Sequence, residues 1–218
     1  MAEELGKIEK LPVDKYKKGR KLFFIPLIYL GEDTPVEYLA LFNKYWEQVT
    51  KQLADLESKL GSVKKIYHEL IPVAGDEGCN AVKDLNEKSH NLIQTTMIKG
   101  AQMEALEDGN KMTEFMDWSR CLLIGLQNPD VIKSIYDSYM ESGKKRNEYI
   151  AGKIDETLDS DEIGILFMRE NHQIQFPSDI QVFYVAPPAL DEIKRWIREQ
   201  EQQQIKTEEE TLEDNNGG

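Results

Sequence analysis

The sequence is poor in the residues that build covalent or metal frameworks. Its 218 residues include two cysteines, Cys79 and Cys121, and three histidines. The cysteines lie far apart and form no Cys-x-x-Cys pair, which argues against a disulfide framework and favours a reducing, cytoplasmic compartment. A metal site would have to draw on His68, His90 or His172 together with carboxylates.

Long apolar runs are missing as well. The longest, residues 22–30, contains Pro26 and is too short to span a membrane. It follows a basic segment without a small-residue cleavage site, so we predict neither a signal peptide nor a membrane partner. The chain has no Walker loop, no Gly-x-Gly-x-x-Gly dinucleotide motif, no His-Glu-x-x-His and no Gly-x-Ser-x-Gly elbow. The sequence therefore contains none of these short motifs that would predict a particular reaction.

Positive charge is in deficit. The 27 Lys and Arg residues against 40 Asp and Glu give a formal net charge of −13. Binding along a nucleic-acid backbone needs clustered cations, so we expect no nucleic-acid partner. The basic cluster at residues 15–21 is interpreted as the solvated end of a flexible leader over residues 1–20. An anion-binding arm is the alternative, and a nucleic-acid or ribosome-associated function would rest on this cluster alone.

Strand patterns occur towards both ends of the chain. Residues 21–30 form a continuous apolar run, typical of a strand covered on both faces. Pro26 predicts that this strand lies at a sheet edge or carries a bulge. Further strands are predicted at 64–73, 162–168 and 180–185.

A block of helices separates the second and third predicted strands. The predicted helices of this block, and a closing helix, cover residues 75–108, 111–126, 130–158 and 189–203. Strands that frame a helical insertion favour one domain over two. We therefore predict an α/β domain over residues 21–203, with a single sheet of at least four strands. A disordered acidic tail is predicted over residues 204–218.

The helix predicted after the first strand, residues 36–60, carries a regular apolar stripe. Its members recur at alternating steps of three and four residues: Leu39, Phe42, Trp46, Val49, Leu53, Leu56 and Leu60. Such a stripe is typical of a helix packed on a sheet. A homodimer seam through residues 36–60 is the alternative.

Polar residues stand at or near the ends of the predicted strands. Glu69 lies near the end of the second strand, His172 follows the third, and Arg146 lies on the helix before it. In open α/β sheets ligands bind beyond the carboxyl ends of the strands, so we predict that these residues meet around one cleft. A histidine with carboxylates would suit a divalent metal or acid–base chemistry, and an arginine would bind an anionic group. Ordinary polar turns and a helix-surface ion pair are the structural alternative.

Taken in chain order, these elements resemble the TraB/Tiki superfamily. The family pattern has two Gly-x-x-His motifs, a glutamate after the second strand and an arginine on the late helix. Residues 21–196 match it in place at Gly31, Glu69, Arg146 and His172. The resemblance implies the fold of proposed metal-dependent peptidases, related to erythromycin-esterase-like proteins. It also implies Glu69, Arg146 and His172 as catalytic residues, with Glu69 and His172 as metal ligands.

Two positions depart from the family pattern. Thr34 stands where the first histidine belongs, and Arg169 replaces the glycine before His172. We therefore expect a binding or interaction protein on this scaffold, with a degenerate active site and an unidentified protein or small molecule as ligand. The alternative is an active metal-dependent hydrolase with Glu32 or Asp33 in place of the missing histidine.

Overall fold

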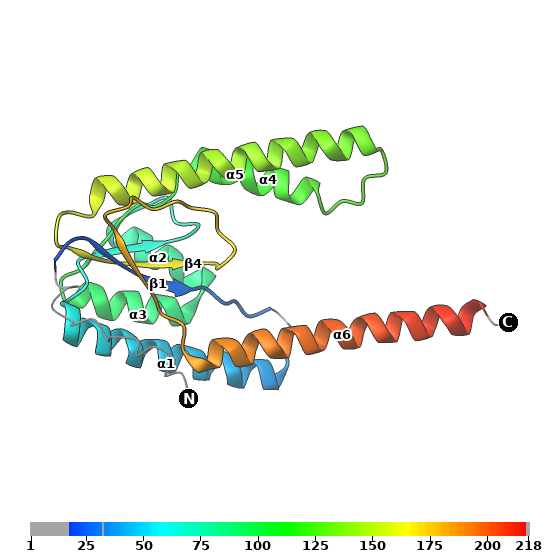
Figure 1. Ribbon diagram of the computed structural model, residues 1–218, viewed down its shortest axis with the longest axis horizontal. Coiled ribbons are helices and arrows are strands. Elements are labelled where there is room, and N and C mark those ends of the chain that lie inside the picture. Colours follow the sequence, from blue (N-terminus) through cyan, green and yellow to red (C-terminus); the bar gives the residue numbers. More distant parts are fainter. Residues whose placement is uncertain (1–17, 32, 217–218) are drawn as a thin grey trace, which may run out of the picture.

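The computed structural model describes residues 18–31 and 33–216, with the side chains of residue 204 and residues 206–216 excepted. Five strands form one sheet, and helices lie on both of its faces (Figure 1). The strands are β1 (Lys21–Pro26), β2 (Lys65–His68), β3 (Gln102–Met103), β4 (Ile163–Met168) and β5 (Gln181–Tyr184). The helices are α1 (Val36–Leu60), α2 (Gly75–Leu85), α3 (Glu87–Ile98), α4 (Gly109–Cys121), α5 (Pro129–Thr157) and α6 (Pro188–Asn216).

All neighbouring strands run parallel, in the order β3-β2-β4-β1-β5. Leu22 pairs with Gly164 on one side and with Val182 on the other. Ile66 pairs with Ile165, so the predicted α/β fold with a single sheet is confirmed. Because the carboxyl ends of parallel strands share one edge, the loops that follow them meet there.

The edge position predicted for the first strand is wrong, because β1 lies between β4 and β5. Pro26 is the last residue of β1, where its missing N–H removes no ladder bond. Leu27 donates to β4. Neighbouring residues of a strand donate to opposite sides, so position 26 would donate towards β5, which already ends opposite Phe24. The carbonyl of Pro26 accepts a hydrogen bond from the Tyr45 hydroxyl at 2.5 Å.

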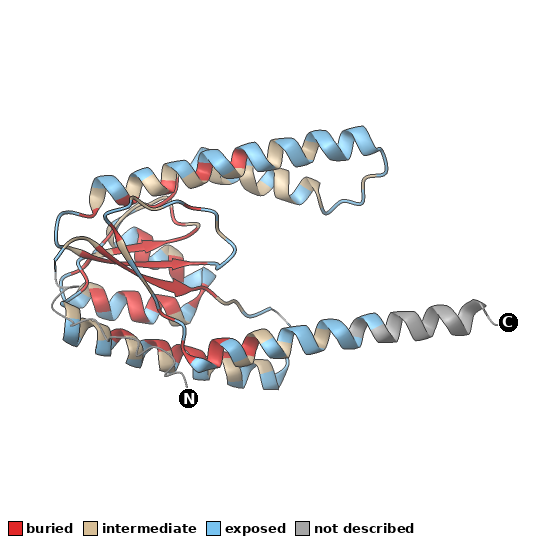
Figure 2. Ribbon diagram, viewed as in Figure 1, coloured by how far each residue is buried: buried red, intermediate tan, exposed pale blue. Residues whose placement is uncertain are grey.

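The larger core lies between the sheet and a layer made of α1, α2, α3 and α6 (Figure 2). The residues that α1 buries are Phe42, Tyr45, Trp46, Val49 and Leu53. They pack with strand residues such as Phe23 and Phe167 in one cluster. Most of the predicted stripe therefore packs against the chain's own sheet, as expected for a core helix.

On the opposite face the sheet is covered mainly by α5. Ile150 and Ile154 pack there against Phe24 and Leu166 in a second, smaller cluster. α4 packs along the first part of α5, and α4 itself contains no buried residue. Together α4 and the outer part of α5, residues 109–144, form a helical hairpin that extends beyond the sheet (Figure 1); we call it the α4–α5 arm.

The continuous helix predicted over residues 75–108 is wrong. Asn86 has an extended backbone that ends α2, and its side chain accepts a hydrogen bond from the Ser89 N–H at the start of α3. Asparagine is among the best N-cap residues, which explains the break. Gly100, at φ 101°, turns the chain after α3 into the unpredicted strand β3. β3 has only two residues, which is too short to show an alternating pattern.

The closing helix is longer than the sequence predicts. α6 continues beyond Gln203 to Asn216, and its outer half projects from the body of the molecule (Figure 1). Residues 199–214 are rich in Glu and Gln, which favour helix even without packing partners. The predicted leader over residues 1–20 lies mostly outside the described residues.

Candidate functional site

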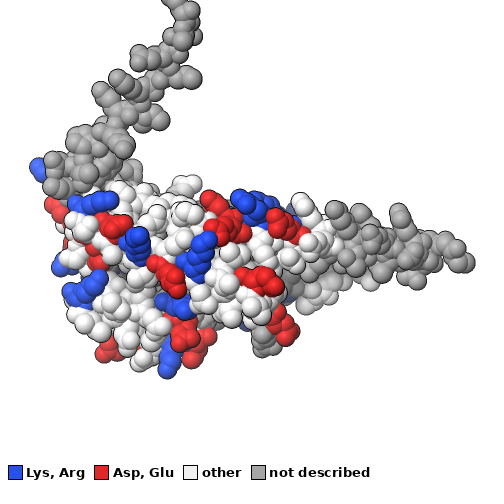
Figure 3. Space-filling model, turned by 90° about the horizontal axis from the view of Figure 1, so that it is seen from below, with Lys and Arg blue, Asp and Glu red and all other residues white. Residues whose placement is uncertain are grey.

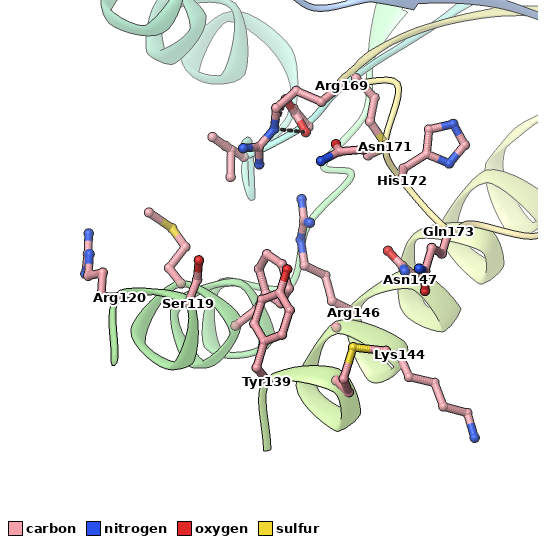
Figure 4. A pocket seen from close by; sticks show the side chains of 17 residues that line it. Ser119, Arg120, Tyr139, Lys144, Arg146, Asn147, Arg169, Asn171, His172 and Gln173 are labelled. Atoms are coloured by element: carbon pink, nitrogen blue, oxygen red, sulfur yellow. Dashed lines mark hydrogen bonds and ion pairs between the residues drawn. The ribbon is translucent and has the colours of Figure 1, made fainter. Parts of the chain in front are cut away.

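A cleft of about 520 Å³ lies between the carboxyl edge of the sheet and the α4–α5 arm. Glu69, Arg146 and His172 all line it, so the structure places the three predicted site residues around one cavity (Figure 4). Glu69 follows β2, His172 follows β4, and Arg146 reaches in from α5. Their common position follows from the parallel strands, but their partners differ from one another.

Glu69 is a buried carboxylate held by two side chains. It is 2% exposed, and Nε of Arg169 donates to both of its oxygens at 3.1 and 3.3 Å. The Tyr29 hydroxyl donates to Oε1 at 3.0 Å. Burial, followed by the negative charge of Glu69, raises the pKa of Tyr29 above its usual range. Tyr29 therefore stays a proton donor, and Glu69 has a fixed orientation in the cleft wall.

Arg146 is paired with Glu107, a residue that the sequence analysis did not single out. Its Nε donates to Oε2 of Glu107 at 2.9 Å, and its Nη2 donates to Oε1. Its guanidinium also lies over the Phe115 ring of α4, 5.1 Å from the centroid. Both side chains are almost fully buried. The alternative of a surface ion pair for Arg146 is therefore wrong, since this is a buried, two-point pair.

The same carboxylate fixes an unusual backbone conformation. Oε1 of Glu107 accepts a hydrogen bond from the N–H of Leu70 at 3.0 Å, and Leu70 has φ 66°. A branched side chain rarely adopts this left-handed conformation, and such strain tends to cluster at functional sites. Glu107 thus ties the loop after β2 to α5. The Lys99-Gly100 pair, typical of a helix end, was the sequence signal that could have revealed the strand leading to Glu107.

His172 lines the cleft without contacting Glu69 or Arg146. Its ring packs 5.0 Å from that of Phe24 and 5.7 Å from that of Phe176, measured between centroids. Its Nδ1 accepts a hydrogen bond from the Ile174 N–H at 3.2 Å. Partial burial lowers the pKa of His172, which favours the neutral ring. In Figure 4 the ring points away from the middle of the cleft.

His68 lies directly beneath the cleft, in the core. It is fully buried, with Nδ1 2.7 Å from the Glu69 carbonyl oxygen and Nε2 3.2 Å from Oγ of Ser89. Burial lowers the pKa of His68 to about 4. It is therefore a neutral structural histidine, and His90 is likewise buried, within α3.

The described residues do not fit a metal ion at this site. Both oxygens of Glu69 face Arg169, and the His172 ring turns elsewhere. Among the described residues, no three His, Cys, Asp or Glu side chains come together in a group that could hold a metal. Asp33 lines a different hollow, beside Tyr38 and Trp196. Glu32, the other carboxylate considered for the missing histidine, lies outside the described residues.

Thr34, which stands at the family's first histidine position, has a local structural role. Its Oγ1 donates to the Gly31 carbonyl at 2.7 Å and closes the turn before α1. Both residues line the hollow beside Trp196 and not the cleft.

The cleft is lined by more cations than carboxylates. Its charged lining residues are Arg120, Lys144, Arg146, Arg169 and a single carboxylate, Glu69. Within the described part of the chain, no residue accepts a hydrogen bond from Nη1 of Arg146 or from either Nη of Arg169. Figure 4 shows both guanidinium groups approaching the middle of the cleft from opposite sides. This arrangement offers N–H donors to an anionic group.

The face of the molecule that Figure 3 shows differs from the cleft in its charge pattern. Over α1 and the first part of α6, positive and negative side chains are intermixed (Figure 3), and Lys44 of α1 pairs with Glu192 of α6 at 2.7 Å. In the basic cluster, Arg20 binds Asp155 and Asp179, both at 2.7 Å, and these carboxylates raise its pKa. Residues 15–17 of that cluster lie outside the described residues.

Comparisons of the chain with protein-family models, with curated proteins and with solved structures found no significant match. None of the described helices has both the length and the apolar character needed to cross a membrane.

Proposed function

We propose that this chain is a binding protein that takes a small anionic ligand into the cleft at the carboxyl edge of its sheet. The observation that carries the proposal is the pair of anchored arginines. Arg146 and Arg169 are each held at one side by a buried carboxylate, Glu107 and Glu69, and turn their remaining N–H groups into the cleft.

Anchoring of this kind favours ligand binding for two physical reasons. Arginine presents its donors in a planar fork that matches carboxylate and phosphate oxygens. A side chain that is already fixed loses little conformational entropy when the ligand arrives. Asn147 and Asn171, whose side chains also line the cleft, add neutral donors beside the guanidinium groups.

The resemblance to the TraB/Tiki superfamily supports the same proposal. Glu69, Arg146 and His172 stand at the matching positions and line one cleft, as a related scaffold would require. The pairing of Glu69 with Arg169, the residue that replaces the family's glycine, favours binding over hydrolysis. A carboxylate engaged in this way is a poor metal ligand, because a metal ion would have to compete with Arg169 for the oxygens of Glu69.

The cysteines are consistent with a cytoplasmic protein, which we include in the proposal. Cys79 is buried and Cys121 is half-buried, and both are free thiols. Burial raises the pKa of Cys79, so it remains a protonated, unreactive thiol.

Calorimetric titration with propionate and with inorganic phosphate tests the proposal. We expect at least one of these anions to bind weakly and in a salt-dependent manner. Arg169→Lys keeps a cation beside Glu69 but removes the guanidinium fork, and should weaken binding by about 10-fold. Arg198→Lys, on an exposed part of α6, is the matched control and should leave binding unchanged.

Two results would contradict the proposal. One is that neither anion binds to a folded protein. The other is a stoichiometric divalent metal in elemental analysis of the purified protein, together with peptide hydrolysis that is lost in Glu69→Gln. That second result would establish the metal-dependent hydrolase instead.

A further inference from the structure

An exposed apolar stripe on α5 continues the cleft along the α4–α5 arm. Ile132, Tyr136 and Met140 are spaced four residues apart, which places them on one face of the helix. They are 39%, 52% and 42% exposed. Met140 also lines the cleft, so the stripe begins at the cleft and runs towards the turn of the arm.

The neighbouring helix adds to the same surface. Met116 of α4 lines the cleft, and Leu123 lies two helical turns further along, just beyond the end of α4, with 83% of its surface exposed. Both helices thus carry apolar side chains between the cleft and the tip of the arm. We call Met116, Leu123, Ile132, Tyr136 and Met140 the apolar track.

Resting on the proposed function, we infer that the ligand is a single-chain amphiphile. Its anionic head group would bind Arg146 and Arg169, and its alkyl chain would lie along the apolar track. Charge complementarity at one end of the cleft and apolar contact at the other favour such a ligand. Exposed apolar side chains that lead up to a polar, cationic cavity favour a binding surface over a solvated face.

The dimensions of the track suit an alkyl chain of medium length. From Met140 to Ile132 the helix rises about 12 Å, at 1.5 Å per residue. A short carboxylate such as propionate would fill the head-group end only. Dodecanoate would also reach along the track, and its chain would shield the exposed side chains from water.

Titration with matched carboxylates tests the inference. We expect dodecanoate to bind roughly 100-fold more tightly than propionate, because several buried methylenes each add a few-fold in affinity. Dodecanol, which has the same chain and no charge, should bind at least 10-fold more weakly than dodecanoate. Both ligands are used well below their aggregation limits.

A double variant locates the chain on the arm. Ile132→Ser with Tyr136→Ser should reduce the affinity for dodecanoate by 10-fold or more and leave that for propionate unchanged. Val131→Ser is the matched control, since Val131 is 45% exposed on the same helix but lines a separate hollow beside Trp118. A thermal melt of each variant shows that the fold is retained.

The outcomes separate this inference from the proposed function. If propionate binds and dodecanoate binds no more tightly, the amphiphile is wrong and the anion site stands. If neither carboxylate binds, the inference is overturned, and the proposed function has failed as well if phosphate does not bind. If the double variant leaves dodecanoate binding unchanged but abolishes a concentration-dependent dimer, the track is covered by a second copy of the chain, and the inference is overturned.

Discussion

Helices α1 and α4 both carry aromatic and other apolar side chains at helical spacing, but they pack differently against the sheet. α1 buries five residues against the sheet, whereas α4 buries none. The larger core lies on the α1 side, and the opposite face is covered chiefly by the inner half of α5. On the proposed function, the layer of α1 contributes most of the stability, and the layer of α4 and α5 contributes contacts to the ligand.

The cleft lies where these two layers meet the edge of the sheet. Glu69 and Glu107 follow strands that the core fixes in position. Arg146 belongs to α5, which covers the face of the sheet opposite α1. The Arg146–Glu107 pair is thus a buried polar link between α5, just beyond the arm, and the segment that follows β3. A ligand that bound there would contact a rigid wall on one side and a less packed helical hairpin on the other.

The largest effect should come from the layer of α1. Trp46→Ala should lower the free energy of unfolding by about 3–5 kcal/mol, because the ring is 4% exposed in the core. Trp118→Ala on α4, where the ring is only half-buried, should cost about 1 kcal/mol. Denaturant unfolding of both variants measures the difference, which equal losses would contradict.

The same experiment decides whether the α1 stripe is a core or a dimer seam. A loss of stability in Trp46→Ala that is independent of protein concentration supports a core helix. A loss that grows on dilution would mean that the stripe joins two copies.

Next in size is the link between the layers. Glu107→Gln should lower the free energy of unfolding by about 3 kcal/mol, because it leaves the buried charge of Arg146 without its counterion. Asp137→Asn, which breaks the exposed pair with Lys133 on the arm, is the control and should cause no measurable change. If Glu107→Gln also left the free energy of unfolding unchanged, the pair with Arg146 would not contribute to stability.

Much of the fold could be predicted because its elements carry clear periodicity. The apolar runs at Leu22 and Ile165 and the stripe on α1 were sufficient to predict one sheet with a packed helix. The failures have local causes. Pro26 falls at the end of β1, at a position where an N–H would have no partner on β5. Asn86 ends one helix and caps the next.

The candidate site was predictable in position but not in pairing. Parallel strands bring Glu69 and His172 to the same edge, and this follows from topology alone. Glu107 was missed, because the two-residue strand before it has no alternation and its surroundings were interpreted as helix. Whether Glu69 faces a metal or Arg169 depends on side-chain geometry, which a spacing of residues does not encode.

A smaller effect should distinguish the two histidines near the cleft. Burial lowers the pKa of His68 to about 4 in the folded chain, whereas the pKa in the unfolded chain is about 6.5. Between these two pH values only the unfolded chain binds a proton at this residue. Stability should therefore fall as the pH drops from about 6.5 to 4, by at most about 3 kcal/mol from this residue. His68→Gln should flatten that part of the pH profile, measured by denaturant unfolding. His172→Gln should flatten it less, since His172 is only half-buried; equal profiles would contradict the burial argument.

The smallest effect is expected at the outer half of α6, the region least connected to either layer. Ile205 is 55% exposed, and the sequence beyond it is mostly Glu, Thr, Asp and Asn. Ending the chain after Gln203 should therefore shift the melting temperature by less than about 2 °C, because the removed segment contains few apolar residues. Ending it before Ile193, which is 1% exposed beneath α1, should instead prevent stable folding. A large shift on removal of the outer segment alone would mean that these residues make contacts that support the fold.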